Sequence, residues 1–225
     1  MIVKKIANPH KSASRRVRIG RLADYIESPE TAAPADRATD ADLAKANRVA
    51  GLADYAGRTT ADDLREKCVY GGARGLMALD RDDRKAEMLA LARRAVRSKD
   101  PISHYVLSWR AGERPTPAQV EEAVDIFLDE LGLAGHQAIY GLHADTDNRH
   151  LHLMVNRVHP ETCRLMLPNK GGRDLEAAHR AIARIEHVQG WRREARGRYR
   201  VRDDGTLRRD RHPPCLLYTS PSPRD

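Results

Sequence analysis

The chain has 225 residues, enough for one or two domains with a sizeable core. Forty Lys and Arg against 32 Asp and Glu give a formal charge of +8, and no apolar run approaches the roughly 18 residues of a membrane span. These values exclude a transmembrane protein, and the polar sequence after Met1 argues against a secretory signal. Cys68, Cys163 and Cys215 are too few and too scattered for a disulfide framework or a zinc site. We therefore expect a cytoplasmic protein.

Hydrophobic patterning in the first hundred residues predicts one strand followed by helices. The strand covers residues 2–7, and a polar loop at 8–16 leads to a helix that ends before Pro29. Residues 28–41 are rich in Ala, Pro, Asp and Thr, which indicates a loop or an insertion. The predicted helices cover residues 18–27, 42–55 and 80–97.

Two further helices are predicted in the second half of the chain. Thr116, followed by Pro and then by Gln three residues on, has the form of a capped helix start, and an apolar stripe continues to Gly132. Asp174 is the predicted cap of a helix that runs to about Gln189. Its predicted inward-facing residues are Leu175, Ala178, Ile182 and Ile185.

Strands alternate with these helices. The predicted strands cover residues 104–110, 137–143 and 150–158, with a short one at 164–167. Beyond Gly190 the chain is rich in Arg and poorly patterned. Strands interleaved with helices, together with adjacent antiparallel pairs, predict an α+β fold with a central, mainly antiparallel sheet flanked by helices.

The positive charge is concentrated at the two ends of the chain. Residues 1–21 carry seven bases and no acid, and residues 191–211 carry nine Arg against four acids. This distribution suits a protein that docks a polyanion. Solvated surface charge with a basic tail would give the same pattern.

The most informative segment holds three histidines on two predicted strands. His150 and His152 share a strand face because side chains alternate along a strand. His143 ends the preceding strand and can stand opposite them, so three imidazoles converge as a catalytic divalent-metal site requires. Asp145 is placed to accept an imidazole N–H and fix that ring. The alternative is that these are ordinary polar positions, and the other histidines have no such neighbours.

A metal held by neutral imidazoles, beside basic flanks, suggests phosphodiester chemistry with in-line attack by a metal-bound water or by a side chain. Tyr25 follows the first basic run, and Arg21 lies one helical turn before it, where it would lower the pKa of the phenol or bind phosphate. Tyr25 is therefore the candidate nucleophile. A core position is the alternative interpretation. The remaining tyrosines have less local support.

These residues resemble a known family. The segment from His143 to Asn156, written HxDxxxxHxHxxxN, is similar to the third motif of the MOB P-type conjugative relaxases (mobilisation nucleases), a branch of the His-hydrophobe-His endonucleases. The segment Leu-Ala-Asp-Tyr-Ile around Tyr25 looks like their first motif. The likeness covers about residues 1–200 and is close to TraI-like relaxases of integrative and conjugative elements. Residues 68–75 occupy the place of the second motif but hold no Ser.

The resemblance implies an enzyme that cuts one DNA strand at an origin of transfer. Tyr25 would form a 5′-phosphotyrosyl link and free a 3′-OH, and the reverse reaction would reclose the strand. His143, His150 and His152 would hold a divalent metal, with Asp145 as a catalytic partner. Mg²⁺ or Mn²⁺ is expected, and Zn²⁺, Co²⁺ or Ni²⁺ also suits three imidazoles.

A relaxase would act on single-stranded origin-of-transfer DNA, together with relaxosome accessory proteins and a type IV coupling protein. The predicted DNA contacts are Lys11, Arg15, Arg16, Arg18, Arg21 and Asn156. Two alternatives remain. One is a rolling-circle replication initiator, which often has a second Tyr one helical turn beyond the first. The other is a non-catalytic DNA-binding protein stabilised by a metal.

The resemblance also divides the chain. We expect a relaxase domain over residues 1–200 with an insertion at 31–63, followed by a basic tail or linker at 201–214. Residues 215–225 look like a translated sequencing adapter, so we expect them to be non-native.

Overall fold

The computed structural model describes residues 1–6, 14–27, 68–98, 100–166 and 173–210. Five strands form one sheet in the order β1-β3-β5-β4-β2, and every neighbouring pair is antiparallel. The strands are β1 (Ile2–Ile6), β2 (Cys68–Arg74), β3 (Ile102–Ser108), β4 (Ala138–His143) and β5 (His150–Asn156). The predicted α+β fold with a central antiparallel sheet is confirmed.

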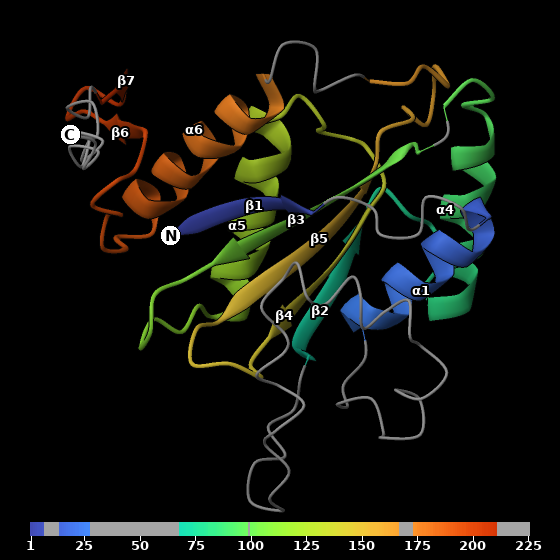
Figure 1. Ribbon diagram of the computed structural model, residues 1–225, viewed down its shortest axis with the longest axis horizontal. Coiled ribbons are helices and arrows are strands. Elements are labelled where there is room, and N and C mark those ends of the chain that lie inside the picture. Colours follow the sequence, from blue (N-terminus) through green and yellow to red (C-terminus); the bar gives the residue numbers. More distant parts are fainter. Residues whose placement is uncertain (7–13, 28–67, 99, 167–172, 211–225) are drawn as a thin grey trace, which may run out of the picture.

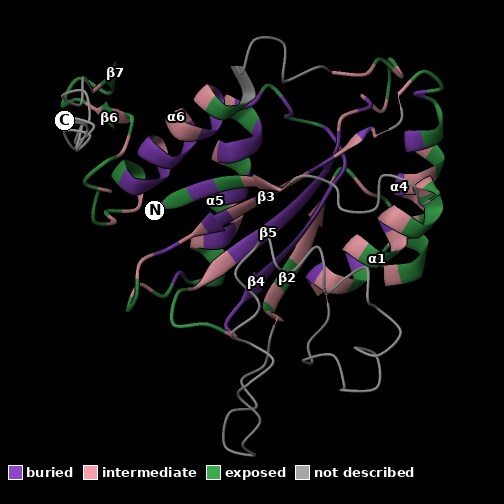
Figure 2. Ribbon diagram, viewed as in Figure 1, coloured by how far each residue is buried: buried purple, intermediate pink, exposed green. Residues whose placement is uncertain are grey.

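Helices cover both faces of this sheet (Figure 1). On one face lie α5 (Pro117–Glu130) and α6 (Arg173–Val188), which pack against each other. On the other face lie α1 (Arg15–Glu27) and α4 (Arg81–Arg93), and α1 contacts β2, β4 and β5. Figure 2 shows that the inner strands β4 and β5 are buried along almost their whole length.

Strand alternation sends large apolar side chains to the α5/α6 face. There they meet the helices in a continuous core around Phe127, whose ring lies edge-on to Tyr105 at 5.2 Å between centroids. Buried strand residues of this core include Tyr105, Leu107, Tyr140, Leu142, Leu151 and Leu153. Because each such side chain removes apolar surface from water, this face supplies most of the hydrophobic stabilisation.

The α1/α4 face has a smaller core. Ile139 of β4 and Met154 of β5 pack against Ile19 and Ile26 of α1 and Met88 of α4. The residues next to Ile139 and Met154 on this same side of the strands include Gly141, His143, His150 and His152. The alternation that builds the larger core on one face therefore leaves the polar set on the other.

Side chains at the helix starts explain where two helices begin. Thr116 accepts from the backbone N–H of Gln119, and the Gln119 side chain accepts from the N–H of Thr116, so the predicted capping box is confirmed. Asp80 caps α4 by accepting from the N–H groups of Asp82 and Asp83.

Several elements differ from the sequence prediction. Strand β2 was not predicted. Of the predicted strand at 164–167, the described residues 164–166 form no strand and make one isolated bridge, Val158 to Leu165. Helix α6 begins at Arg173, before the predicted cap, and Leu175 is exposed rather than inward. The Arg-rich C-terminal part contains an unpredicted hairpin of β6 (Tyr199–Val201) and β7 (Leu207–Arg209).

Some predictions lie outside the described residues. These are the loop at 28–41, the helix at 42–55, the insertion at 31–63, and residues 211–225. Within the described ranges, no helix combines the length and apolarity that crossing a bilayer requires.

Candidate metal centre and nucleophile

The structure brings the three predicted histidines together on the α1/α4 face. In the β4–β5 ladder His143 pairs with His150, and Gly141 pairs with His152, so all three imidazoles leave the sheet on one side. One nitrogen of each ring lies within 4.8 Å of a nitrogen of both others. The ring centroids of His143 and His152 are 4.4 Å apart, and His150 lies 5.4 and 5.0 Å from them. This spacing suits three ligands of one ion.

Hydrogen bonds on the second nitrogen of two rings indicate which nitrogen would face the ion. His143 Nε2 lies 2.9 Å from the carbonyl oxygen of Ile26, and His150 Nδ1 lies 3.1 Å from that of Asn148. A carbonyl only accepts, so each of these nitrogens carries the proton. In the neutral rings the lone pairs then sit on His143 Nδ1 and His150 Nε2, the atoms available to a metal. The donor set therefore fits a divalent ion.

Asp145 lies beside His150. Its Oδ1 is 3.4 Å from His150 Nε2, and the carboxylate is 6% exposed. The two form an ion pair when His150 is protonated. Because this is the nitrogen that we assign to the metal, Asp145 adds negative charge where a cation would bind.

His104 is a residue of this cluster that sequence reasoning missed. The expectation that His104 has no such neighbours is wrong, because its Nε2 lies 2.9 Å from His152 Nδ1. The two rings are tilted by 31° with centroids 5.2 Å apart. Part of the His104 surface remains accessible, yet burial of the ring lowers its pKa to about 4. The available signal was the strand pattern at 104–110, which placed His104 on the second strand of the sheet.

Tyr25 lies against the same imidazoles. Its ring is edge-on to His143 and His152, with centroids 5.4 and 5.0 Å away, and the side chain is half-buried near the end of α1. The next residue, Ile26, offers its carbonyl to His143. A Cβ on Gly141 would lie only 2.3 Å from that carbonyl oxygen, so glycine is what allows α1 to approach β4 this closely.

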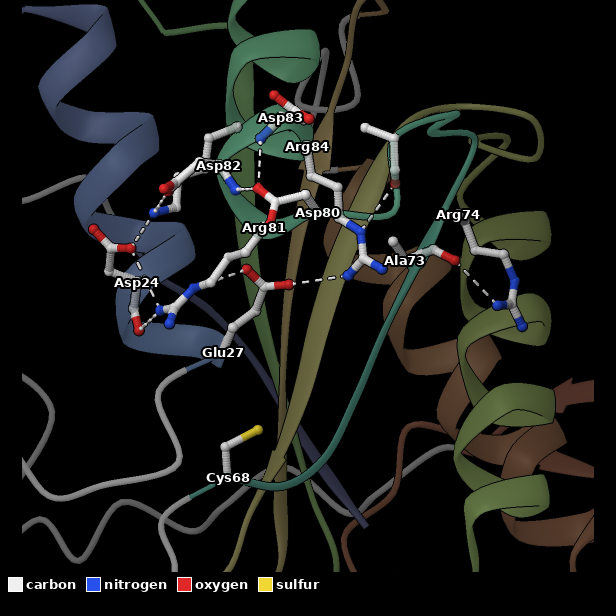
Figure 3. A network of polar contacts seen from close by, with 12 residues as sticks. Asp24, Glu27, Cys68, Ala73, Arg74, Asp80, Arg81, Asp82, Asp83 and Arg84 are labelled. Carbon is white, nitrogen blue, oxygen red and sulfur yellow. Dashed lines mark hydrogen bonds and ion pairs between the residues drawn. The ribbon is translucent and has the colours of Figure 1, made fainter.

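Charged side chains hold the end of α1 against α4, as Figure 3 shows. Arg81 contacts Asp24 and Glu27, at 3.4 and 3.3 Å, and donates to the Asp24 carbonyl at 2.9 Å. Arg84 reaches Glu27 at 3.3 Å, and Lys85 pairs with Asp24. Burial raises the pKa of Glu27 above 4.5, although the Arg81, Arg84 and Lys85 charges oppose that rise. The network's two α1 residues, Asp24 and Glu27, lie before and after Tyr25 in the chain.

A family model described as relaxase, MobA/VirD2-like nuclease domain, matches residues 56–191, more than half of the chain. The chain belongs to this relaxase family. The match includes all three metal-type histidines, and Tyr25 precedes it.

Curated relatives agree with this assignment. Protein MobA of Acidithiobacillus ferrooxidans is 67% identical over 123 residues, which cover 55% of this chain and 30% of that protein. Two Escherichia coli proteins named TraI are 35% and 34% identical over 40% and 49% of this chain. The relaxase chain thus spans less than a third of the length of these relatives. A solved structure described as "Molecular Basis of Vancomycin Resistance Transfer in Staphylococcus aureus" aligns with 57% of this chain and 75% of its own, at 13% identity and a TM-score of 0.38.

The predicted DNA contacts of the relaxase separate into two groups. Arg16 and Arg21 are exposed on α1. Arg15 instead donates to the carbonyl of Ala92 in α4 and to those of Ala95 and Ser98 after its end, and Arg18 lies 3.9 Å from the Asp100 carboxylate. The second group therefore packs α1 onto its neighbours. Lys11 lies outside the described residues.

Asn156 does not fit a DNA contact, which corrects that prediction. It has no exposed surface, donates to the Met88 carbonyl and the Gln137 side chain, and accepts from the N–H of Val158. It therefore ties β5 to α4, and a buried amide must be satisfied in this way.

Proposed function

We propose that this relaxase domain nicks one strand of an origin of transfer, holds the cut 5′ end as a phosphotyrosyl link on Tyr25, and religates the strand by the reverse reaction. The observation that carries the proposal is the contact of the Tyr25 ring with His143 and His152, at 5.4 and 5.0 Å between centroids. A nucleophile must lie this close to the ion that binds the scissile phosphate.

The chain's own groups divide the work in this proposal. Tyr25 Oη bonds to phosphorus and gives up its phenolic proton, the P–O3′ bond breaks, and the departing 3′ oxygen takes up a proton. Arg21, exposed one helical turn before Tyr25, adds positive charge for a phosphate. The phosphotyrosyl bond keeps the energy of the phosphodiester bond. Reclosing the strand therefore needs no nucleotide cofactor.

His143 Nδ1 and the Nε2 atoms of His150 and His152 would hold the metal. A divalent ion bound there would polarise the oxygens of the scissile phosphate and offset the charge of the transition state. Three imidazoles favour Mn²⁺, Co²⁺, Ni²⁺ or Zn²⁺ by ligand type, and phosphate and water would complete the shell of Mn²⁺ or Mg²⁺. Asp145 places a carboxylate beside this set.

The substrate and partners follow the same proposal. The substrate is single-stranded origin-of-transfer DNA, met by Arg16 and Arg21 on the exposed side of α1. Accessory proteins of the relaxosome and a type IV coupling protein would act with the relaxase in the cytoplasm. The partners are proposed by analogy with longer relatives, since the match covers 30% of MobA.

The test is the capture of a covalent adduct. The chain is incubated with Mn²⁺ and a pool of single-stranded oligonucleotides of randomised sequence, and protein–DNA species that survive denaturant are isolated and sequenced. We expect an adduct from the wild type, none from Tyr25→Phe, and none after chelation. Tyr199→Phe is the matched control, because it removes a phenol that contacts Glu176, away from the histidines, and should keep the adduct.

Three other outcomes would point to a different function or to a different nucleophile. A protein that binds the pool with metal but forms no adduct is a metal-stabilised DNA-binding protein. An adduct that persists in Tyr25→Phe assigns the nucleophile to another residue. Adduct sequences that match a plasmid replication origin would favour a rolling-circle initiator.

A further inference from the structure

His104 is held beside one ligand of the proposed metal centre. Strand β3 lies between β1 and β5, and in the β3–β5 ladder Val106 pairs with His152. His104 is two residues from Val106 and on the same strand face, so its ring reaches His152 diagonally across the ladder. The 2.9 Å between His104 Nε2 and His152 Nδ1 is a hydrogen-bond distance.

His152 differs from the other two ligands in what its second nitrogen meets. His143 and His150 each donate to a backbone carbonyl, and a carbonyl fixes the direction of the bond because it only accepts. An imidazole nitrogen can donate or accept. The proton between His104 and His152 can therefore sit on either ring, and its position decides which nitrogen of His152 carries a lone pair.

We propose that His104 is a positioning residue that accepts the Nδ1–H of His152 and so keeps the His152 Nε2 lone pair directed at the metal. The inference rests on the metal role in the proposed function. Once His152 Nε2 is a ligand, its Nδ1 carries the proton, and His104 Nε2 is the acceptor at 2.9 Å. Partners of this kind orient ligand rings and raise ligand basicity.

His104 is not a fourth ligand in this arrangement. The nitrogen that it turns toward the centre is engaged with His152 Nδ1, and in a five-membered ring Nδ1 and Nε2 point in different directions. Among the described residues, the side chains whose potential ligand atoms lie within 4.8 Å of one another here are His143, His150 and His152. His104 therefore acts on the metal through His152.

Two substitutions of His104 distinguish the effect of its hydrogen-bond acceptor from that of its aromatic ring. His104→Phe keeps an aromatic ring and removes the acceptor, whereas the amide oxygen of His104→Gln can reach the position of Nε2. Co²⁺ affinity is measured by calorimetry without DNA, and the ligand-field absorption of bound Co²⁺ reports the donor geometry. We expect His104→Phe to bind Co²⁺ about 10- to 100-fold more weakly with an altered spectrum, and His104→Gln to recover most of the affinity.

Controls distinguish positioning from packing. His136→Phe makes the same change at a buried histidine just before β4, at the strand end opposite His143, and should leave Co²⁺ affinity unchanged. Thermal unfolding with chelator should give similar midpoints for His104→Phe and His104→Gln. The proposal is overturned if His104→Phe binds Co²⁺ like the wild type, or if both His104 variants lose affinity equally and unfold early.

The result is separable from that of the adduct experiment. A wild type that binds Co²⁺ in a His104-dependent way but yields no phosphotyrosyl adduct would refute the proposed reaction and keep this inference. A normal adduct together with unchanged Co²⁺ binding by His104→Phe would refute this inference alone. A wild type that binds no Co²⁺ would remove the metal centre and His104's role with it.

Discussion

The face of the sheet under α5 and α6 and the face under α1 and α4 are built from the same strands but bury different chemistry. Along β4, Tyr140 and Leu142 enter the larger core, whereas Ile139, Gly141 and His143 turn to the opposite side. The α5/α6 face is continuous apolar packing. The α1/α4 face has a small core beside a cluster of four imidazoles and a tyrosine.

One sheet thus separates the residues that stabilise the fold from those that could carry chemistry. Unpaired polar groups in a core are costly, so a cluster of imidazoles is better placed where little apolar burial is lost. The side chains that hold α1 in place are correspondingly polar. Glu27 and Asp24 pair with α4, the Ile26 carbonyl accepts from His143, and Gly141 leaves room for the contact.

Removing Phe127 should produce the largest effect on the α5/α6 face. Its side chain is completely buried and packs on Tyr105, so Phe127→Ala leaves a cavity and should lower the free energy of unfolding by about 3–5 kcal/mol. Urea denaturation followed by circular dichroism measures the loss. Val188→Ala, at a residue that is 56% exposed, is the control and should change it little. A loss below about 1 kcal/mol for Phe127→Ala would contradict the assignment of stability to this face.

Gly141→Ala should affect the opposite face and mainly the reaction. The new Cβ would lie 2.3 Å from the Ile26 carbonyl oxygen and 3.0 Å from Cys68 Sγ, so α1 must move away from β4 and take Tyr25 with it. We expect the rate of adduct formation to fall about 100-fold, equivalent to about 2.7 kcal/mol of activation free energy.

Gly20→Ala is the matched control for Gly141→Ala. It makes the same change inside α1, where a Cβ meets no atom within 4 Å, so it should keep the adduct rate and stabilise the helix by about 0.5–1 kcal/mol. An adduct rate in Gly141→Ala equal to that of Gly20→Ala would show that the close approach of α1 to β4 is not needed.

The sequence predicted local features of both faces and missed those that depend on pairing between distant segments. The alternation of His150 and His152, with His143 at the end of the preceding strand, was sufficient to group them. His104 was missed because its partner is 48 residues away and strand order brings them together. Strand β2 was missed because glycines interrupt its pattern at Gly71 and Gly72.

The basic run before Tyr25 illustrates the same limit. Charge alone could not distinguish Arg21, which is exposed, from Arg15, which donates to three carbonyls in and just after the last turn of α4. The distinction follows from how α1 packs on α4, and neither helix specifies that packing by itself. The sequence likewise suggested Tyr25 as a nucleophile without predicting the contact between Ile26 and Gly141 that positions it.

The smallest effect that we expect is on how the free energy of unfolding depends on pH. One carboxyl on each face should change it, and the two changes should have opposite signs. On the α5 side, burial raises the pKa of Glu121, but hydrogen bonds from Tyr140 and Tyr70 and the charge of Arg74 outweigh it, so the pKa lies below 4.5. Its stabilisation is present above pH 4.5 and is lost as pH falls through the lowered pKa. Glu27 behaves in the opposite way, because desolvation raises its pKa despite Arg81 and Arg84. Its contribution to the stability of the fold is fully present below pH 4.5 and is lost as pH rises through the raised pKa.

Glu27→Gln and Glu121→Gln separate the two contributions. Free energies of unfolding are measured for both variants and the wild type at several values between about pH 3 and pH 7. The wild-type advantage over Glu121→Gln should shrink toward acid, since protonation removes the charge that Tyr140, Tyr70 and Arg74 stabilise. The advantage over Glu27→Gln should shrink toward neutral pH, since ionising a desolvated carboxyl is costly even beside arginines. If the wild-type advantage over both variants changed with pH in the same direction, the ion pairs between α1 and α4 would outweigh the burial of Glu27. The two faces would then not differ in how they stabilise their acids.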